Sequence, residues 1–144
     1  MLRRAILDAN VVLRYLLNDD PRQSPEAVDL IERAPDGSLY LSAIVLAEVT
    51  WTLRSHFTVP REEISSAVQR VIARPSIVAD ATTLDAVARH ANVDVDFVDC
   101  ALAAAGGATG LPVATFDRDF SKFGDMVAKR PRELLADIAS PDEE

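Results

Sequence analysis

Short apolar runs alternate along this chain with longer segments in which apolar residues recur at helical spacing. The runs predict strands at residues 5–8, 39–41, 76–79, 111–115 and 126–128. The helical spacing predicts helices at residues 10–17 and 24–34, and others beginning at Ser42, at Pro60, at Thr82 or Thr83, and at Asp96. Strands that alternate with helices favour an α/β fold, a three-layer α/β/α sandwich around a central, mainly parallel sheet of four to five short strands.

Local signals mark where several of these elements begin and end. Ser24, followed by Pro25, is expected to cap the second helix, and Ser42 is expected to cap the third. The glycine pair at 106–107 is expected to end the helix that begins at Asp96. The length of 144 residues predicts one domain, residues 1–139, followed by a frayed acidic tail at residues 140–144.

Four carboxylates stand alone in uncharged, mostly apolar stretches: Asp8, Glu48, Asp99 and Asp117. An isolated ionised carboxylate in an apolar setting costs several kcal/mol unless it is paired or binds a metal. No Lys or Arg lies inside these stretches to pair with the four acids locally. We therefore expect a bound cation to keep them charged if the fold gathers them.

The predicted sheet would bring these four acids close together. Asp8 and Asp117 follow two predicted strands, while Glu48 and Asp99 lie on helices next to strands. Because sites of open parallel sheets lie beyond the carboxyl ends of the strands, the four acids are expected to converge at one end of the sheet. Oxygen ligands of this kind select Mg²⁺ or Mn²⁺, and such ions activate water for phosphodiester hydrolysis.

Other chemistry has little support in the composition. His56 and His90 are on separate predicted helices and Cys100 is the one cysteine, which argues against a zinc site and excludes an internal disulfide. Cys100 is expected to be a small buried apolar residue in a cytoplasmic protein. The net charge of −8 argues against a broad basic nucleic-acid surface, but a metal site still reaches phosphates. No apolar run is long enough for a membrane span.

Four motifs together resemble the PIN-domain ribonucleases, and the size of the chain is similar to that of VapC-type toxins of bacterial toxin–antitoxin pairs. The motifs are Asp8-Ala9-Asn10, Leu46-Ala47-Glu48-Val49, Asp96-Phe97-Val98-Asp99-Cys100-Ala101-Leu102-Ala103-Ala104 and Ala114-Thr115-Phe116-Asp117-Arg118-Asp119-Phe120. Each motif is weak alone, and their order and spacing carry the resemblance over residues 3 to about 129.

The resemblance implies a type II toxin that is an Mg²⁺- or Mn²⁺-dependent endoribonuclease. Its catalytic and metal-binding residues would be Asp8, Glu48, Asp99 and Asp117. Asp119 matches an auxiliary acid, and Asn10 and Thr115 match polar positions that orient the acids or water. The family also implies an RNA substrate, a homodimer and a separate antitoxin protein that blocks the site.

Several of these residues also have a structural alternative, whereas Glu48, in the middle of a predicted helix among apolar neighbours, has none. Asp8 and Asp96 suit helix caps, Asp99 suits a helix first turn, and Asp117 suits a turn. Trp51 is expected to pack in the core or a dimer rather than stack on a base. Three cations flank the motifs as candidates for phosphate contacts, although solvated surface charge is the favoured interpretation: Arg14, Arg118 and Lys122.

Three other functions compete with the ribonuclease. A haloacid-dehalogenase-type phosphatase needs a second Asp two residues after the first, where this chain has Asn10. A receiver domain needs paired early acids and a phosphorylatable Asp after the third strand; Asp80 follows that strand, but the pair is missing. A module of the same fold that binds RNA or protein without cutting stays open.

Overall fold

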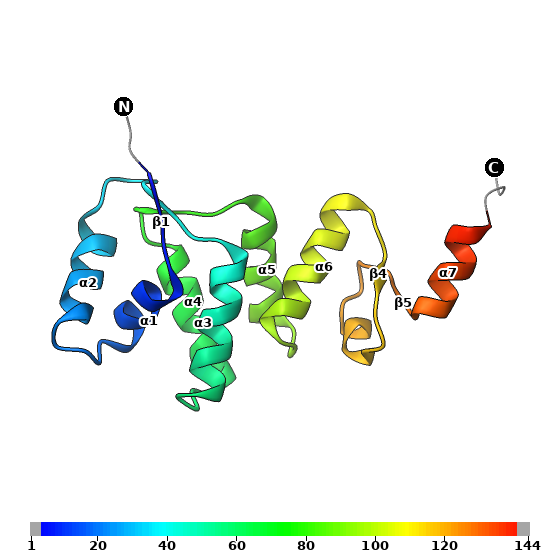
Figure 1. The fold of residues 1–144 in the computed structure, drawn as a ribbon, viewed down its shortest axis with the longest axis horizontal. Helices are drawn as coiled ribbons and strands as arrows, with labels where there is room; N and C mark the ends of the chain where they lie inside the picture. Colours follow the sequence, from blue (N-terminus) through cyan, green and yellow to red (C-terminus); the bar gives the residue numbers. More distant parts are fainter. Residues whose placement is uncertain (1–3, 141–144) are drawn as a thin grey trace.

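The computed structural model describes residues 4–140 of the chain, and Figure 1 shows an elongated arrangement of helices and short strands. The elements follow in chain order as β1 (Ala5–Ile6), α1 (Ala9–Leu17), α2 (Gln23–Arg33), β2 (Leu39–Tyr40), α3 (Ala43–Ser55), α4 (Arg61–Ile72), β3 (Ile77–Val78), α5 (Ala81–Asn92), α6 (Phe97–Thr109), β4 (Val113–Ala114), the 3₁₀ turn η1 (Arg118–Lys122), β5 (Ala128–Lys129) and α7 (Pro131–Ala139). The predicted α/β class is confirmed. Helix α7 was not predicted.

The strands are parallel, as the alternation of strands and helices predicted. They form two sheets, β1-β2-β3 and β4-β5, rather than one central sheet. In the first sheet Ala5 lies opposite Leu39 and Leu39 opposite Ile77; in the second, Val113 lies opposite Ala128. Figure 1 shows β1 in the half of the molecule that holds α1 and α2, and β4 and β5 beyond α6 in the other half.

The helix starts show which capping signals were right. Ser42 caps α3 as predicted, because its hydroxyl oxygen accepts a hydrogen bond from the N–H of Val45 at 3.3 Å. Ser24 lies inside α2, whose first turn is held by Asp20; the Asp20 carboxylate accepts hydrogen bonds from the N–H groups of Arg22 and Gln23. The cap of α5 is Asp80 rather than a threonine, and it accepts from the N–H of Thr83 at 2.7 Å.

Helix α6 continues through the glycine pair that was expected to end it. It ends at Thr109, and Gly110 follows with φ +71°, a left-handed conformation that glycine adopts without steric cost. Gly106 serves a different purpose. A Cβ built there would lie 3.2 Å from the carbonyl oxygen of Leu111, so glycine lets the chain turn back closely against the helix.

One core connects the helices with the first sheet. Leu46 and Val49 of α3, Val68 of α4, and Cys100 of α6 are fully buried in it. Phe120 of η1 is also buried there, so the segment after β4 shares this core. The core therefore fixes α6, whose first turn carries Asp99.

The last helix differs from the others, because α7 has no buried residue. Of the predicted acidic tail, Ser140 follows α7, and residues 141–144 lie outside the described part of the chain. Among the described helices, none combines the length and apolar character that a membrane crossing requires.

Candidate metal centre

Asp99 projects from the first turn of α6, which begins after Asp96. The turn is anchored by the neighbouring side chains Phe97 and Cys100, both buried in the core. Asp99 itself is half-buried. This burial raises the pKa of the Asp99 carboxyl above its usual value, and the nearby negative charge of Asp117 raises it further. A cation placed beside Asp99 would oppose both effects, because an opposite charge favours the ionised carboxylate.

Asp117 and Asp119 come from the segment between β4 and η1. The hydroxyl oxygen of Thr115 accepts a hydrogen bond from the N–H of Asp117 at 2.9 Å. Asp117 in turn caps η1, since its Oδ1 accepts from the N–H of Asp119 at 2.8 Å. Lys122 lies 3.7 Å from Asp119, at the other end of η1. Thr115 is thus hydrogen-bonded to the turn that carries the two carboxylates; an orienting role for it stays a prediction.

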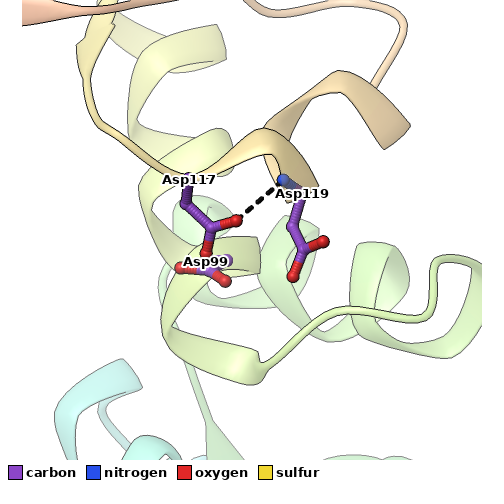
Figure 2. Close-up of side chains that lie close together, drawn as sticks. All are labelled: Asp99, Asp117 and Asp119. Atoms are coloured by element: carbon purple, nitrogen blue, oxygen red, sulfur yellow. Dashed lines mark hydrogen bonds between the residues drawn. The ribbon is translucent and has the colours of Figure 1, made fainter.

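The three carboxylates meet in space. One oxygen each from Asp99, Asp117 and Asp119 lies within 4.8 Å of the other two, and Figure 2 shows the side chains gathered beside the first turn of α6. Three hard oxygen donors at this separation suit Mg²⁺ or Mn²⁺, which coordinate carboxylates and retain several waters. The donor set therefore fits the metal that the sequence implied.

A groove of about 500 Å³ leads to this cluster. Its lining includes Trp51 and Arg54 of α3, His90 of α5, and the acids Asp99 and Asp117. Trp51 is 68% exposed, so it does not pack in the core of the chain, and packing in a dimer stays a prediction. An exposed aromatic ring and a guanidinium beside an acidic cluster are groups that contact bases and phosphates.

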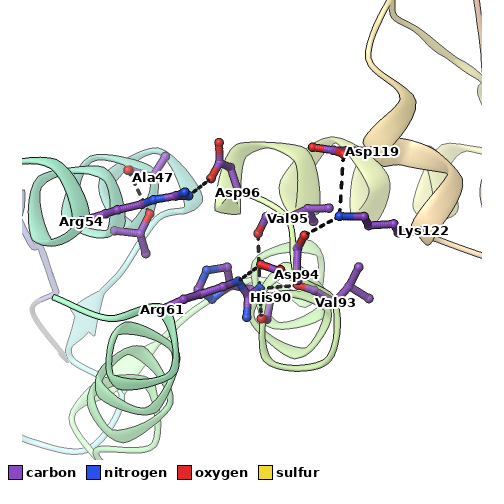
Figure 3. A network of polar contacts seen from close by, with 11 residues as sticks. Ala47, Arg54, Arg61, His90, Val93, Asp94, Val95, Asp96, Asp119 and Lys122 are labelled. Atoms are coloured by element: carbon purple, nitrogen blue, oxygen red, sulfur yellow. Dashed lines mark hydrogen bonds and ion pairs between the residues drawn. The ribbon is translucent and has the colours of Figure 1, made fainter. Parts of the chain in front are cut away.

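Two arginines shape the groove in different ways (Figure 3). Arg61 of α4 donates hydrogen bonds to the carbonyl oxygens of His90, Val93 and Val95, and it pairs with Asp94 at 3.2 Å. It therefore holds the loop between α5 and α6. Arg54 pairs with Asp96 at 2.5 Å, and both side chains are largely exposed. The sequence reasoning missed Arg54, although it lies three residues after Trp51, almost one helical turn along α3.

The structure gathers two of the four predicted acids, Asp99 and Asp117, together with the auxiliary Asp119. Asp8 lies outside this group. It is exposed and caps α1, with its Oδ1 accepting from the N–H of Ala9 at 2.7 Å. Glu48 also lies outside the group, on the exposed side of α3. The expected convergence of all four acids in one chain is therefore not seen in this conformation.

The remaining candidates have mixed outcomes. Asn10 is exposed on α1 and lines a separate hollow with Arg14, away from the carboxylate cluster. Arg118 lines another hollow, between η1 and α7. Cys100 is fully buried, and burial raises the pKa of its thiol to about 12, which confirms the expected inert apolar role.

Comparison with known protein families identifies the family of this chain. The model of the PIN domain family matches residues 5–126, and the chain therefore belongs to the PIN domain family. PIN domains are typically metal-dependent nucleases, and the carboxylate cluster lies within the matched region. No curated protein matches the chain.

Proposed function

We propose that this chain is a metal-dependent endoribonuclease and the toxin of a type II toxin–antitoxin pair. The main support for nuclease activity is the acidic cluster in a chain of the PIN domain family. In this cluster, one carboxylate oxygen each from Asp99, Asp117 and Asp119 lies within 4.8 Å of the other two. Asp8 and Glu48 are proposed to complete the metal-binding set. The toxin role, the antitoxin partner and the homodimer rest on the resemblance to VapC-type toxins.

The chemistry follows from the donors. Asp99 and Asp117 would hold Mg²⁺ or Mn²⁺, and the ion when bound would lower the pKa of a water and neutralise charge on the phosphate. Asp119 is positioned to accept a proton or orient a water, since its backbone N–H is fixed by Asp117. Trp51 and Arg54, on the wall of the groove, are proposed to hold the RNA strand.

The experiment is cleavage of labelled RNA in Mg²⁺, with EDTA as a metal-free control. Asp99→Asn and Asp117→Asn keep side-chain shape and remove the charge that holds the ion, so each is expected to lower cleavage at least about 100-fold. Asp29→Asn, which changes an exposed acid of α2, is the matched control and is expected to leave cleavage unchanged. Near-normal cleavage by both site variants would refute the assigned site.

The toxin role needs a test in cells. Growth is expected to stall when the wild-type chain is induced and to continue when Asp99→Asn is induced at the same level. Equal growth of the two strains, together with RNA cleavage in vitro, would indicate a housekeeping nuclease. If the purified protein instead binds RNA without cutting it, the module of the same fold without catalysis is the correct interpretation. The match to the PIN domain family supports a nuclease over the haloacid-dehalogenase-type phosphatase.

A further inference from the structure

The two sheets each end in an open edge. In β1, the N–H groups of Ala5 and Leu7 donate to β2, at the carbonyl oxygens of Ser38 and Tyr40. Because backbone groups alternate in direction along a strand, those of Ile6 face the opposite, outer side. In β4, the N–H groups of Val113 and Thr115 donate toward the carbonyl oxygens of Val127 and Lys129. The backbone groups of Ala114 therefore face the outer side of the second sheet.

These two edges fit each other as parallel neighbours. If Ile6 and Ala114 exchange their outward hydrogen bonds, Ile6 comes opposite either Val113 or Thr115, since paired groups in a parallel ladder are offset by one residue. Asp8, two residues further along, then comes level with Thr115 or Asp117. In either register, joining the edges brings Asp8 to the turn that carries the metal-binding acids.

Within one chain, the contacts of the second sheet oppose this pairing. Arg89 of α5 holds Asp125 through two hydrogen bonds of 2.8 and 2.6 Å, and its guanidinium lies over the ring of Phe123. Phe120 and Phe123 are buried in the same core as residues of α5 and α6. Figure 1 shows α3 to α6 between β1 and β4 along the long axis of the molecule. A chain that paired its own β4 with its own β1 would lose these contacts.

Apolar side chains beside both strand edges are exposed to solvent. Ile6 is 77% exposed and Phe116 is 81% exposed, and α7 presents Leu135 and Ile138 to solvent. A helix of nine residues is marginal in water without a packed face. An open strand edge with exposed apolar neighbours is a template for another chain. A second copy of this chain offers the matching edge and the matching apolar surface.

We propose that two copies of this chain exchange their C-terminal segments, so that β4 of each copy pairs with β1 of the other. Each nuclease site then combines Asp8 of one copy with Asp99, Asp117 and Asp119 of the other. The inference rests on the proposed nuclease function for the role of the site, but the strand exchange itself does not depend on activity. It accounts for the separation of Asp8 from the cluster in a single chain.

Complementation of inactive variants tests the shared site. Chains carrying Asp8→Asn and chains carrying Asp117→Asn are inactive alone, but co-refolding equal amounts forms mixed dimers with one intact site. A statistical mixture of two-fold dimers is expected to recover about one quarter of wild-type cleavage. The matched control mixes Asp99→Asn with Asp117→Asn chains, which change the same half of the site, and recovers nothing. Equal recovery by both mixtures, or by neither, would overturn the shared site.

Cross-linking tests the exchange without using activity. Ile6→Cys chains mixed with Val113→Cys chains are expected to give a cross-linked dimer with a short bis-maleimide, and neither variant alone is expected to do so. Cys100 is buried, so the wild-type chain is the background control. A chain with both substitutions that cross-links only as a monomer would overturn the exchange, even if RNA cleavage is normal. Cross-linked dimers without any cleavage would instead refute the proposed function and keep the exchange.

Discussion

Residues 4–109 and residues 113–139 differ in how they obtain their stability. The first region packs a three-stranded sheet and six helices around a core in which Leu46 and Val68 are fully buried. The second region has two strands of two residues each and a helix without a buried residue. Two-stranded sheets are marginal on their own in water. We therefore expect the first region to be the more stable of the two, and the second to depend on its contacts with the shared core for its order.

The candidate metal centre is divided between these two regions. Asp99 belongs to the well-packed region, because α6 is fixed by the core. Asp117 and Asp119 belong to the dependent region and reach Asp99 through the turn to which Thr115 is hydrogen-bonded. A site built on both regions is assembled only while they stay joined. Events that loosen the second region are therefore expected to remove activity before they unfold the first.

The largest expected effect contrasts one leucine from each region. Leu46→Ala empties a fully buried position of α3, and such truncations cost about 2–5 kcal/mol of unfolding free energy. Leu135 of α7 is 67% exposed, so Leu135→Ala is expected to change the stability of the dilute monomer by less than about 0.5 kcal/mol. Urea denaturation followed by circular dichroism measures both.

Protein concentration sharpens this contrast. If copies exchange their C-terminal segments, Leu135→Ala will weaken the dimer, and its effect will grow as the concentration rises. The effect of Leu46→Ala will remain large at every concentration. Equal destabilisation of the dilute monomer by both variants would show that α7 is packed, contrary to the contrast between the two regions.

A smaller effect is expected from His90, at the floor of the groove in the first region. Its side chain is buried and lies edge-on to Phe97, with ring centroids 5.8 Å apart. Burial, with the nearby charge of Arg61 as a second cause, lowers its pKa from 6.5 to about 4, while Asp96 opposes this. Below about pH 6.5, His90 is therefore protonated in the unfolded chain but stays neutral in the folded chain. Stability is lost as the pH falls from about 6.5 toward 4.

The shift corresponds to about 3 kcal/mol at most. Denaturation of the wild type and of His90→Gln at a series of pH values measures it, and the stability advantage of the wild type should shrink as the pH falls through this window. His56→Gln alters an exposed histidine at the end of α3 and serves as the control. A difference between wild type and His90→Gln that is constant with pH would contradict the burial of a neutral imidazole.

The sequence predicted the local parts of this picture better than the long-range ones. The cap at Ser42 and the position of Asp99 on a helix first turn depend on neighbours within four residues, and both were right. The division of the strands into two sheets depends on which edges pair, which a sequence of two-residue strands does not determine. The pair of Arg54 with Asp96 spans 42 residues and has no local signal.

The smallest expected effect concerns the joint between the regions, where Arg89 holds Asp125. The Arg89 guanidinium lowers the pKa of the Asp125 carboxyl below its usual value, so this contact is complete above about pH 4 and is lost as the pH falls lower.

Arg89→Lys keeps the charge and removes the paired hydrogen bonds and the planar group over Phe123. We expect little change in global stability, but severalfold faster hydrogen exchange in residues 113–129, with unchanged exchange in α3. Arg33→Lys, an exposed position of α2, is the control. Faster exchange throughout the chain would show that the two regions unfold as one unit, and the second region would then not be the dependent one.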